Sequence, residues 1–139
     1  MSRRWQDLHE GLGPEPLEIG PITRTDSVRY QGASGDMNPI HHDDEFARAA
    51  GFSAPVTVGM FQAGVMHAWL AAWLGPENVR RASMRWKEPV FPGDRLTFTA
   101  AIAKKYELDG ERRVDVELWC KKQTGAVAVT GSATYVVRS

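Results

Sequence analysis

The most uniformly apolar part of the chain is Gly59–Leu74, which has the sequence GMFQAGVMHAWLAAWL. Ala, Met, Leu and Trp dominate it, so an α-helix over these residues is apolar almost all round rather than on one face. A helix of this kind is normally buried inside a protein. Gly75 and Pro76 follow directly and are typical of a helix end. The pattern therefore predicts a buried helix over Gly59–Leu74.

The pattern changes to strand character after this helix. In Val114–Trp119 hydrophobic and polar residues alternate, which predicts a strand with one buried and one exposed face. Asp109-Gly110 and Thr124-Gly125 are typical of hairpin turns. The four predicted strands are Arg81–Trp86, Arg95–Tyr106, Arg113–Lys122 and Ala126–Val137. One buried helix followed by an antiparallel meander predicts an α+β fold, in which a sheet wraps around a helix.

The N-terminal part of the chain is divided by turn residues. Residues 1–16 end in a segment rich in Gly and Pro, and we expect them to form an arm with one short helical turn. The domain itself is then predicted to span residues 17–139. Its first segment, Leu17–Thr25, alternates only weakly and contains Gly20-Pro21, which is typical of a bent strand at a sheet edge.

Two short helices are expected between this strand and the buried helix. Asp26 is a suitable N-cap for a helix that continues through Ala33. Gly35 is expected to end it, because glycine tolerates the left-handed conformation that helix ends require. A second short helix is predicted over Asp43–Ala50, before another glycine.

Composition and charge exclude several classes of partner. The chain contains 17 basic and 17 acidic side chains, so its formal net charge is zero. This balance provides no electrostatic footprint for nucleic acid or for an anionic membrane, and it does not oppose self-association. Cys120 is the single cysteine, and the N-terminus lacks the apolar run of a signal peptide. We therefore expect a soluble cytoplasmic protein. Metal-ligand spacings and phosphate-binding glycine loops are missing from the sequence, so no cofactor is expected.

The segment SGDMNPIHHDD, residues 34–44, is the strongest candidate for chemistry. Pro39 disfavours a continuous helix, so the segment is predicted to be a loop that can bring Asp36 and His41 together. A carboxylate and an imidazole that share one water form an acid–base pair usable near neutral pH. The alternative is that these are ordinary turn and capping residues. His42 and Asp43 are expected to be the exposed rim and the cap of the next helix.

Gly59 is the second candidate. It is placed in the first turn of the buried helix, where backbone N–H groups lack partners within the helix and the dipole favours negative charge. Without a Cβ, its N–H can approach a carbonyl oxygen closely and act as an oxyanion donor. The alternative is that glycine is required here only for packing.

Together these residues resemble a known family. The stretch from Tyr30 to Met60 is similar to the signature Y-x-x-x-S-G-D-x-N-P-I/L-H-x-D and the glycine motif after it, found in MaoC-like (R)-specific enoyl-CoA hydratases and dehydratases. EPVFPGDRLTF, from Glu88 to Phe98, matches a further P-V-x-x-G-D motif of that family. The resemblance implies a hotdog fold, a long central helix wrapped by a curved antiparallel sheet, for residues from about Leu17 onward.

The resemblance also implies a reaction and its residues. Asp36 and His41 would act on the water that adds to the double bond of a trans-2-enoyl thioester, with coenzyme A or an acyl carrier as the thiol. The Gly59 N–H would polarise the thioester carbonyl. Two such chains usually pair edge to edge, so a homodimer or a hetero-oligomer with another hotdog chain is implied. Residues implied to bind substrate are Asn38, Pro39, Val58, Met60 and Gly64.

The sequence departs from the family at two of these positions. Val58 replaces the usual histidine before the helix glycine, and Gly64 occupies a position where some members have a small polar residue. Both departures concern the shape of the site and leave other functions open. These are a subunit of a heteromeric dehydratase, a hotdog acyl-thioesterase and an acyl-CoA-binding protein. His67 is expected to be a hydrogen-bonded core histidine, and Trp69 and Trp73 are expected to pack in the core or to line the acyl tunnel.

Overall fold

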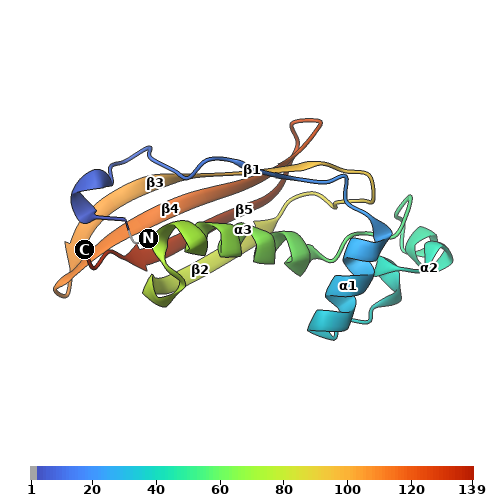
Figure 1. Ribbon diagram of the computed structural model, residues 1–139. Coiled ribbons are helices and arrows are strands. Elements are labelled where there is room, and N and C mark those ends of the chain that lie inside the picture. The colour runs from blue at the N-terminus through green and yellow to red at the C-terminus, as the bar shows by residue number, and fades with distance from the viewer. Residues whose placement is uncertain (1–2) are drawn as a thin grey trace.

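The computed structural model describes residues 3–139 as a five-stranded sheet with one long helix on one face (Figure 1). The strand order is β1-β3-β4-β5-β2, and every neighbouring pair is antiparallel. The strands are β1 (Leu17–Ile19), β2 (Val79–Trp86), β3 (Leu96–Leu108), β4 (Glu111–Lys122) and β5 (Val127–Val136). The α+β prediction is therefore confirmed, and β2 and β1 form the two edges of the sheet.

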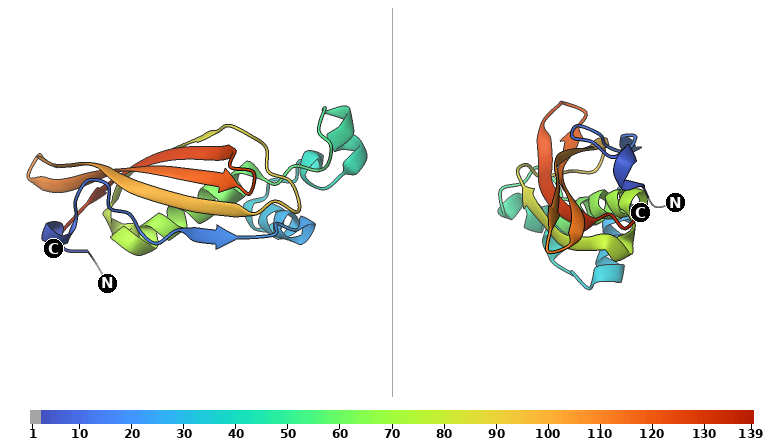
Figure 2. Two further views of the ribbon diagram at one scale, coloured as in Figure 1. Left: turned by 90° about the horizontal axis from the view of Figure 1, so that it is seen from above. Right: turned by 90° about the vertical axis from the view of Figure 1, so that its left-hand side faces the viewer.

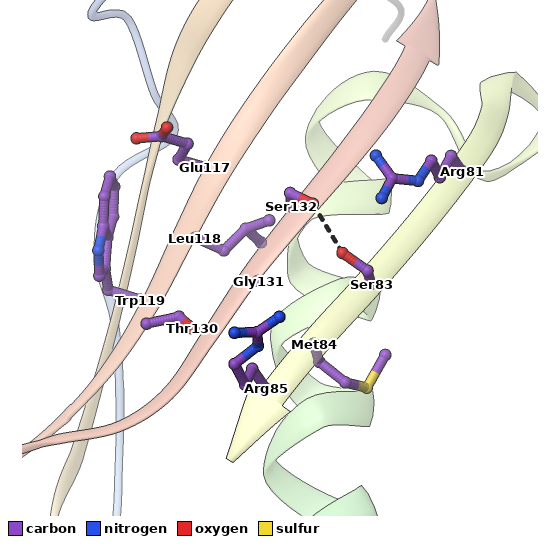
Figure 3. A pocket seen from close by; sticks show the side chains of 10 residues that line it. All are labelled: Arg81, Ser83, Met84, Arg85, Glu117, Leu118, Trp119, Thr130, Gly131 and Ser132. Carbon is purple, nitrogen blue, oxygen red and sulfur yellow. Dashed lines mark hydrogen bonds between the residues drawn. The ribbon is translucent and has the colours of Figure 1, made fainter. Parts of the chain in front are cut away.

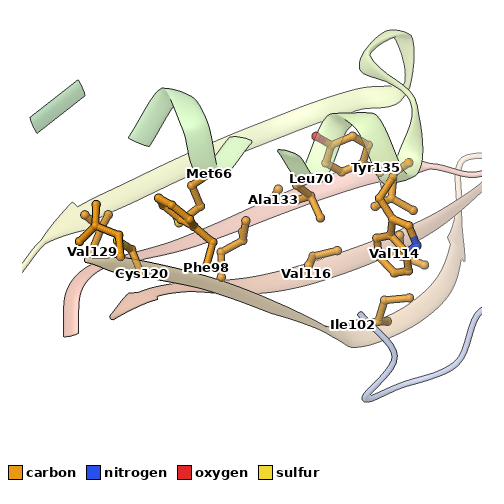
Figure 4. Close-up of a cluster of buried hydrophobic side chains, with 14 of the residues drawn as sticks. Met66, Leu70, Phe98, Ile102, Val114, Val116, Cys120, Val129, Ala133 and Tyr135 are labelled. Carbon is orange, nitrogen blue, oxygen red and sulfur yellow. The ribbon is translucent and has the colours of Figure 1, made fainter. Parts of the chain in front are cut away.

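The long helix is α3, which spans Gly59–Leu74 as the apolar pattern predicts. Gly75 ends it with a positive φ of 94°, a conformation that favours glycine. Figure 4 shows Met66 and Leu70 of α3 packed over the side chains of the sheet. Burial of this apolar surface is the main stabilising contribution to the fold. In the described part of the chain, none of the helices combines the length and the apolar character needed to cross a membrane.

The three central strands form two hairpins at the predicted turns. Asp109 and Gly110 both have positive φ, 51° and 74°, as a tight hairpin turn between β3 and β4 requires. Along β4, Val114, Val116 and Leu118 are fully buried, and the residues between them are more exposed. Cys120 continues this buried row, and burial raises the pKa of its thiol to about 12. The thiol is therefore inert at neutral pH, because the thiolate is the reactive form.

The N-terminal segment packs along the sheet. Trp5–Asp7 forms the single short helical turn, η1, and Leu8 is buried in the core. Gly11 donates a backbone hydrogen bond to Ile102 of β3. The separation of an arm from a domain at residue 16 remains a prediction. The first strand is shorter than predicted, because β1 ends at Ile19, directly before a cis peptide bond between Gly20 and Pro21.

Three short helices lie beyond one end of the sheet, as Figures 1 and 2 show. They are α1 (Arg24–Ser34), η2 (Pro39–His41) and α2 (Asp44–Ala49); a further single turn, η3 (Pro76–Asn78), follows α3. Helix α1 begins earlier than predicted, because Thr23 is the N-cap and Asp26 completes a capping box with it. Gly35 ends α1 in the left-handed conformation, as predicted. We call residues 23–55, which contain α1, η2 and α2, the overhang.

Candidate active site

The predicted acid–base pair meets in the loop that leads from α1 into η2. The Nε2 atom of His41 lies 3.6 Å from Oδ2 of Asp36. This is too long for a direct hydrogen bond, but both atoms can contact a single water molecule. The two side chains differ in environment, since His41 is 12% exposed and Asp36 is 46% exposed. The imidazole thus lies in a nearly closed position, and the carboxylate is open to solvent.

The orientation of His41 is determined by a backbone group. Its Nδ1 lies 2.7 Å from the carbonyl oxygen of Val56, in the segment that leads into α3. A carbonyl can only accept, so Nδ1 carries the proton and donates it to Val56. In the neutral ring, Nε2 is then unprotonated and available to accept a proton. This hydrogen bond therefore selects the tautomer with its basic nitrogen toward Asp36.

Gln31 of α1 was not identified from the sequence as a residue of the site. Its side chain is buried, with 3% exposure. Its Nε2 donates to the backbone carbonyls of Asp36, at 2.8 Å, and of Asn38, at 3.2 Å. Its Oε1 accepts from Nδ1 of His42 at 3.0 Å. Gln31 thus fixes the loop between α1 and η2, and the sequence signal for it is an amide one turn before the glycine that ends α1.

The turn residues of the loop behave largely as expected. The Asn38 side chain accepts from the N–H of Ile40 and caps η2. The Asp43 side chain accepts from the N–H of Phe46 and caps α2. His42 is exposed, in agreement with its predicted place at the rim. These short-range bonds determine the path of the backbone between Asp36 and His41.

A groove of about 320 Å³ opens beside His41. Its walls are largely apolar and come from the overhang, from the start of α3 and from the segment after β2. The apolar lining residues are Ile40, Phe52, Val56, Trp86, Pro89 and Val90. Apolar walls around a few polar groups are typical of a small-molecule site. His41 and Gly59 both line this groove, so the structure brings the predicted base and the predicted oxyanion donor to one cavity.

Gly59 is the first residue of α3, and its neighbour is an indole ring. Trp86 donates from Nε1 to the carbonyl oxygen of Gly59 at 2.9 Å. A Cβ added at Gly59 would lie 2.8 Å from that nitrogen, closer than real Cβ contacts. A side chain at position 59 would therefore displace Trp86 or disturb its hydrogen bond. The N–H of Gly59 belongs to the first turn of α3, where the helix itself offers no acceptor.

The second sequence motif, Glu88–Phe98, supports one wall of the groove. Asp94 accepts from the N–H of Phe91 at 2.9 Å and from Nζ of Lys122 at 3.0 Å. Lys122 also donates to the carbonyl of Pro89, a groove residue. The aspartate of this motif therefore fixes the segment from Pro89 to Asp94 against the end of β4. Asp94 therefore helps to position one wall of the groove.

The residues implied to bind substrate do not line the groove. Val58 is buried as the N-cap of α3, and Met60 and Gly64 are exposed on that helix. Asn38 and Pro39 lie at the start of η2, away from the groove lining. Their contacts with substrate therefore remain predictions. Asp36 is also not a lining residue of the groove. It lies beside His41, which does line the groove.

The prediction for His67 is wrong in one respect. Neither ring nitrogen has a hydrogen-bond partner among the described residues, although both atoms are shielded from solvent. Burial lowers the pKa of the His67 imidazole, so the ring is neutral at physiological pH. Trp73 packs in the core as expected, and Trp69 donates to the carbonyl of Glu15 in the N-terminal segment.

A larger hollow, of about 560 Å³, lies along β2, β5 and β4 (Figure 3). Arg81 and Arg85 of β2 point into it, and Ser83 is hydrogen-bonded to Ser132 across the strands at 2.7 Å. It contains none of the predicted catalytic residues. Residues 3–139 also contain no group of three or more His, Cys, Asp or Glu side chains placed to bind a metal ion. The smaller groove beside His41 is therefore the candidate active site.

Comparison with known proteins gives consistent similarities. The profile of the MaoC like domain matches residues 13–124. The (R)-specific enoyl-CoA hydratase of Rhodospirillum rubrum is 28% identical over 135 residues, which cover 96% of this chain and 90% of that protein. The 3-hydroxyacyl-thioester dehydratase Y of Mycobacterium tuberculosis is 39% identical over 79 residues, 54% of this chain but 27% of that longer protein.

The fold is also found in solved structures. The (R)-hydratase from Aeromonas caviae superimposes with a TM-score of 0.80 at 26% identity, and the match covers 93% of this chain and 96% of that one. The predicted hotdog arrangement is confirmed by this similarity. The similarity also extends over the overhang and the sheet together, because almost the whole of both chains is matched.

Proposed function

Because the chain belongs to the MaoC-like domain family, we propose that it is a hydro-lyase that reversibly hydrates a trans-2-enoyl thioester to a 3-hydroxyacyl thioester. The observation that carries the proposal is the approach of His41 Nε2 and Asp36 Oδ2 to 3.6 Å beside a groove that begins at Gly59. The activities for which the hydratase and dehydratase relatives are named support the same chemistry.

The proposed reaction uses the two side chains as one acid–base unit. The oxygen of a water molecule between Asp36 and His41 bonds to C3 of the enoyl group, and the pair accepts a proton from that water. The pair returns one proton to C2, so its own protonation state is unchanged over the cycle. The Val56 carbonyl stabilises the imidazolium form of His41, because it accepts a stronger hydrogen bond from the charged ring.

The Gly59 N–H has the second role in this proposal. Negative charge develops on the thioester oxygen as C3 is attacked, and a donor aimed at that oxygen lowers the barrier. The start of α3 supplies an unpaired backbone donor and the positive end of the helix dipole. The apolar walls of the groove exclude water and strengthen both interactions. The proposed steps use side chains and backbone groups of the protein, the enoyl thioester and one water molecule.

A spectrophotometric assay tests the proposal. The purified protein is mixed with trans-2-enoyl-CoA substrates of graded chain length, and the loss of the conjugated enoyl absorbance is followed. We expect hydration of at least part of the series. Release of free coenzyme A thiol without hydration would favour the acyl-thioesterase. Tight binding without either reaction would favour the acyl-CoA-binding protein.

We propose that the protein binds an acyl thioester as its substrate and assembles with a second hotdog chain. Strand β2 is eight residues long and is paired on one side only, by β5, within the described chain. The unpaired N–H and C=O groups of such an edge are a template for pairing with a strand of another chain. We expect light scattering after size exclusion to give a dimer or larger species. A stable, active monomer would contradict this, and activity only on co-expression with a second chain would favour the heteromer.

A further inference from the structure

Two polar side chains of the groove lining each contain an oxygen atom that lacks a hydrogen-bond partner among residues 3–139. Thr57 and Gln62 line the groove and are 3% and 2% exposed. The Thr57 hydroxyl oxygen and Oε1 of Gln62 are shielded from solvent, and neither has a hydrogen-bond partner among the described residues. Buried polar atoms are nearly always hydrogen-bonded in folded proteins, so two unpaired ones on a single cavity require an explanation.

Packing alone does not explain the Gln62 amide. Two other buried amides in the structure are bonded at both ends. Gln31 is bonded by three groups in the overhang, and Asn78 donates to Leu74 and accepts from Arg138. A leucine or methionine at position 62 would fill a similar volume without an unpaired oxygen. The amide that lacks a partner is the one that lines the groove.

The positions of the two residues relate them to the reacting carbons. Thr57 precedes the Gly59 N–H by two residues, and Gln62 follows it by three, on the same face of α3. A thioester carbonyl at Gly59 would therefore be flanked by both side chains. The acyl group that extends from this carbonyl would meet largely apolar walls, and besides His41, Lys87 and Glu88 the polar side chains of the lining are Thr57 and Gln62. An unsubstituted alkyl chain would leave both polar groups unpaired.

We infer that Thr57 and Gln62 determine substrate specificity, and that the preferred acyl group carries a hydrogen-bonding oxygen, such as a hydroxyl, near the reacting double bond. A hydroxyl both donates and accepts, so it can donate to Gln62 Oε1 and accept from the Thr57 hydroxyl. Both oxygens are shielded from solvent in the free chain, so the two side chains must turn toward the groove when this substrate binds. Sites that bind a substrate hydroxyl discriminate strongly against the analogue that lacks it, because their own polar groups are then left unpaired. This inference rests on the proposed hydratase function.

The experiment compares matched substrates on matched variants. The substrates are trans-2-enoyl-CoA thioesters of equal chain length, unsubstituted or with a hydroxyl at C4, C5 or C6. We expect the wild-type protein to turn over one hydroxylated substrate with kcat/KM about 10²-fold or more above that of the unsubstituted one. Thr57→Val and Gln62→Leu should each reduce this preference by about tenfold or more. Thr57→Ser, which keeps the hydroxyl, should retain most of it.

The outcomes separate this inference from the function on which it rests. Hydration of all substrates at equal rates by the wild type would overturn the inference and leave the hydratase intact. A uniform loss of kcat in Gln62→Leu would also overturn it, since Gln62 would then act on the attacking water. Absence of hydration with every substrate would overturn the hydratase function itself. Should Gln62→Leu fail to fold, the wild-type preference and the Thr57 pair of variants still decide the question.

Discussion

The overhang and the body of the molecule are stabilised in different ways. The body consists of α3 and the sheet, and its buried hydrophobic cluster contains no residue from 23–55. The overhang has polar contacts of its own: the capping box at Thr23, the loop contacts of Gln31 and the ion pair between Arg24 and Asp44 at 2.7 Å. Outside the core cluster, Tyr30 also contacts Phe61 of α3, and Phe52 contacts Phe91. The proposed catalytic pair therefore lies outside the region that contributes most to stability.

This difference has a physical consequence. Hydrophobic burial is large in free energy but has no directional preference, so it stabilises the fold without aligning reactive atoms. Hydrogen bonds contribute less to stability, but they determine distances and orientations. The bond from His41 to Val56 joins the two regions, because Val56 lies in the segment that enters α3. Changes in the overhang should thus alter activity more than stability, and changes in the body should do the reverse.

The largest effect is expected from the catalytic pair. Asp36→Asn and His41→Ala should each lower kcat/KM by about 10²–10⁴-fold, because general acid–base catalysis is lost. The melting temperature of Asp36→Asn should change little, since this carboxylate is 46% exposed. The double variant should be only slightly slower than either single variant, if the two groups act as a unit.

His42→Ala is the matched control for His41→Ala. Both residues are histidines next to each other in sequence, but the His42 ring is bonded to Gln31 instead of facing Asp36. We expect this variant to keep most of its activity. A loss as severe as that of His41→Ala would mean that the catalytic histidine has been assigned incorrectly, and wild-type turnover by Asp36→Asn would refute the pair.

The opposite behaviour is expected in the body. Phe98 of β3 is completely buried in the core. Phe98→Ala should lower the free energy of unfolding by about 3–5 kcal/mol, because it removes apolar contacts and leaves a cavity. Urea titration gives this change, and kcat per folded molecule should remain close to wild type. Val28→Ala in the overhang is the control, since Val28 is exposed and should change stability by about 0.5 kcal/mol or less.

Gly59 lies where the two regions meet, so its substitution tests both effects at once. Gly59→Ala should lower kcat by about 10²-fold, as expected for the loss of an oxyanion donor, because the new Cβ displaces Trp86, which lines the groove beside the N–H. Turnover and melting temperature should be measured on one preparation. An unchanged rate would refute the oxyanion role, and a fall in melting temperature with a fully active folded fraction would mean that Gly59 only packs. Trp86→Phe separates the loss of the indole hydrogen bond from the blocked approach to the N–H.

The smallest effect concerns the ion pair of the overhang. The hydrogen bond from Arg24 lowers the pKa of Asp44 below its ordinary value of 3.8. A lowered pKa means that the pair contributes stability above pH 3.8 and that this contribution is lost as the pH falls through the folded-state value. The free energy of unfolding of Asp44→Asn should therefore fall less steeply below this pH than that of the wild type. Identical acid profiles for the two proteins would contradict the prediction.

The sequence by itself determined the elements of the body and named the two residues of the proposed acid–base pair. Helix α3 has the bounds that the apolar pattern predicts, and the β3–β4 hairpin turns at Asp109-Gly110. These features depend on local properties, namely side-chain periodicity, backbone freedom at glycine and the fixed φ of proline. The loop predicted around Pro39 allowed Asp36 and His41 to come together, and the family resemblance favoured this pair over ordinary turn and capping residues.

Only the tertiary structure decided which distant groups complete the site. Gln31 supports the loop, Trp86 is hydrogen-bonded to Gly59, and Thr57 and Gln62 line the groove. In the sequence, Gln31 and Gln62 are ordinary polar residues of two helices. The structure shows the Gln31 amide bonded at both ends, and the Gln62 oxygen has no partner within residues 3–139. Whether a buried amide is paired depends on residues brought close by the packing of α3 against the sheet and the overhang. The spacing of residues in the sequence does not predict those contacts, because they join segments that are far apart along the chain.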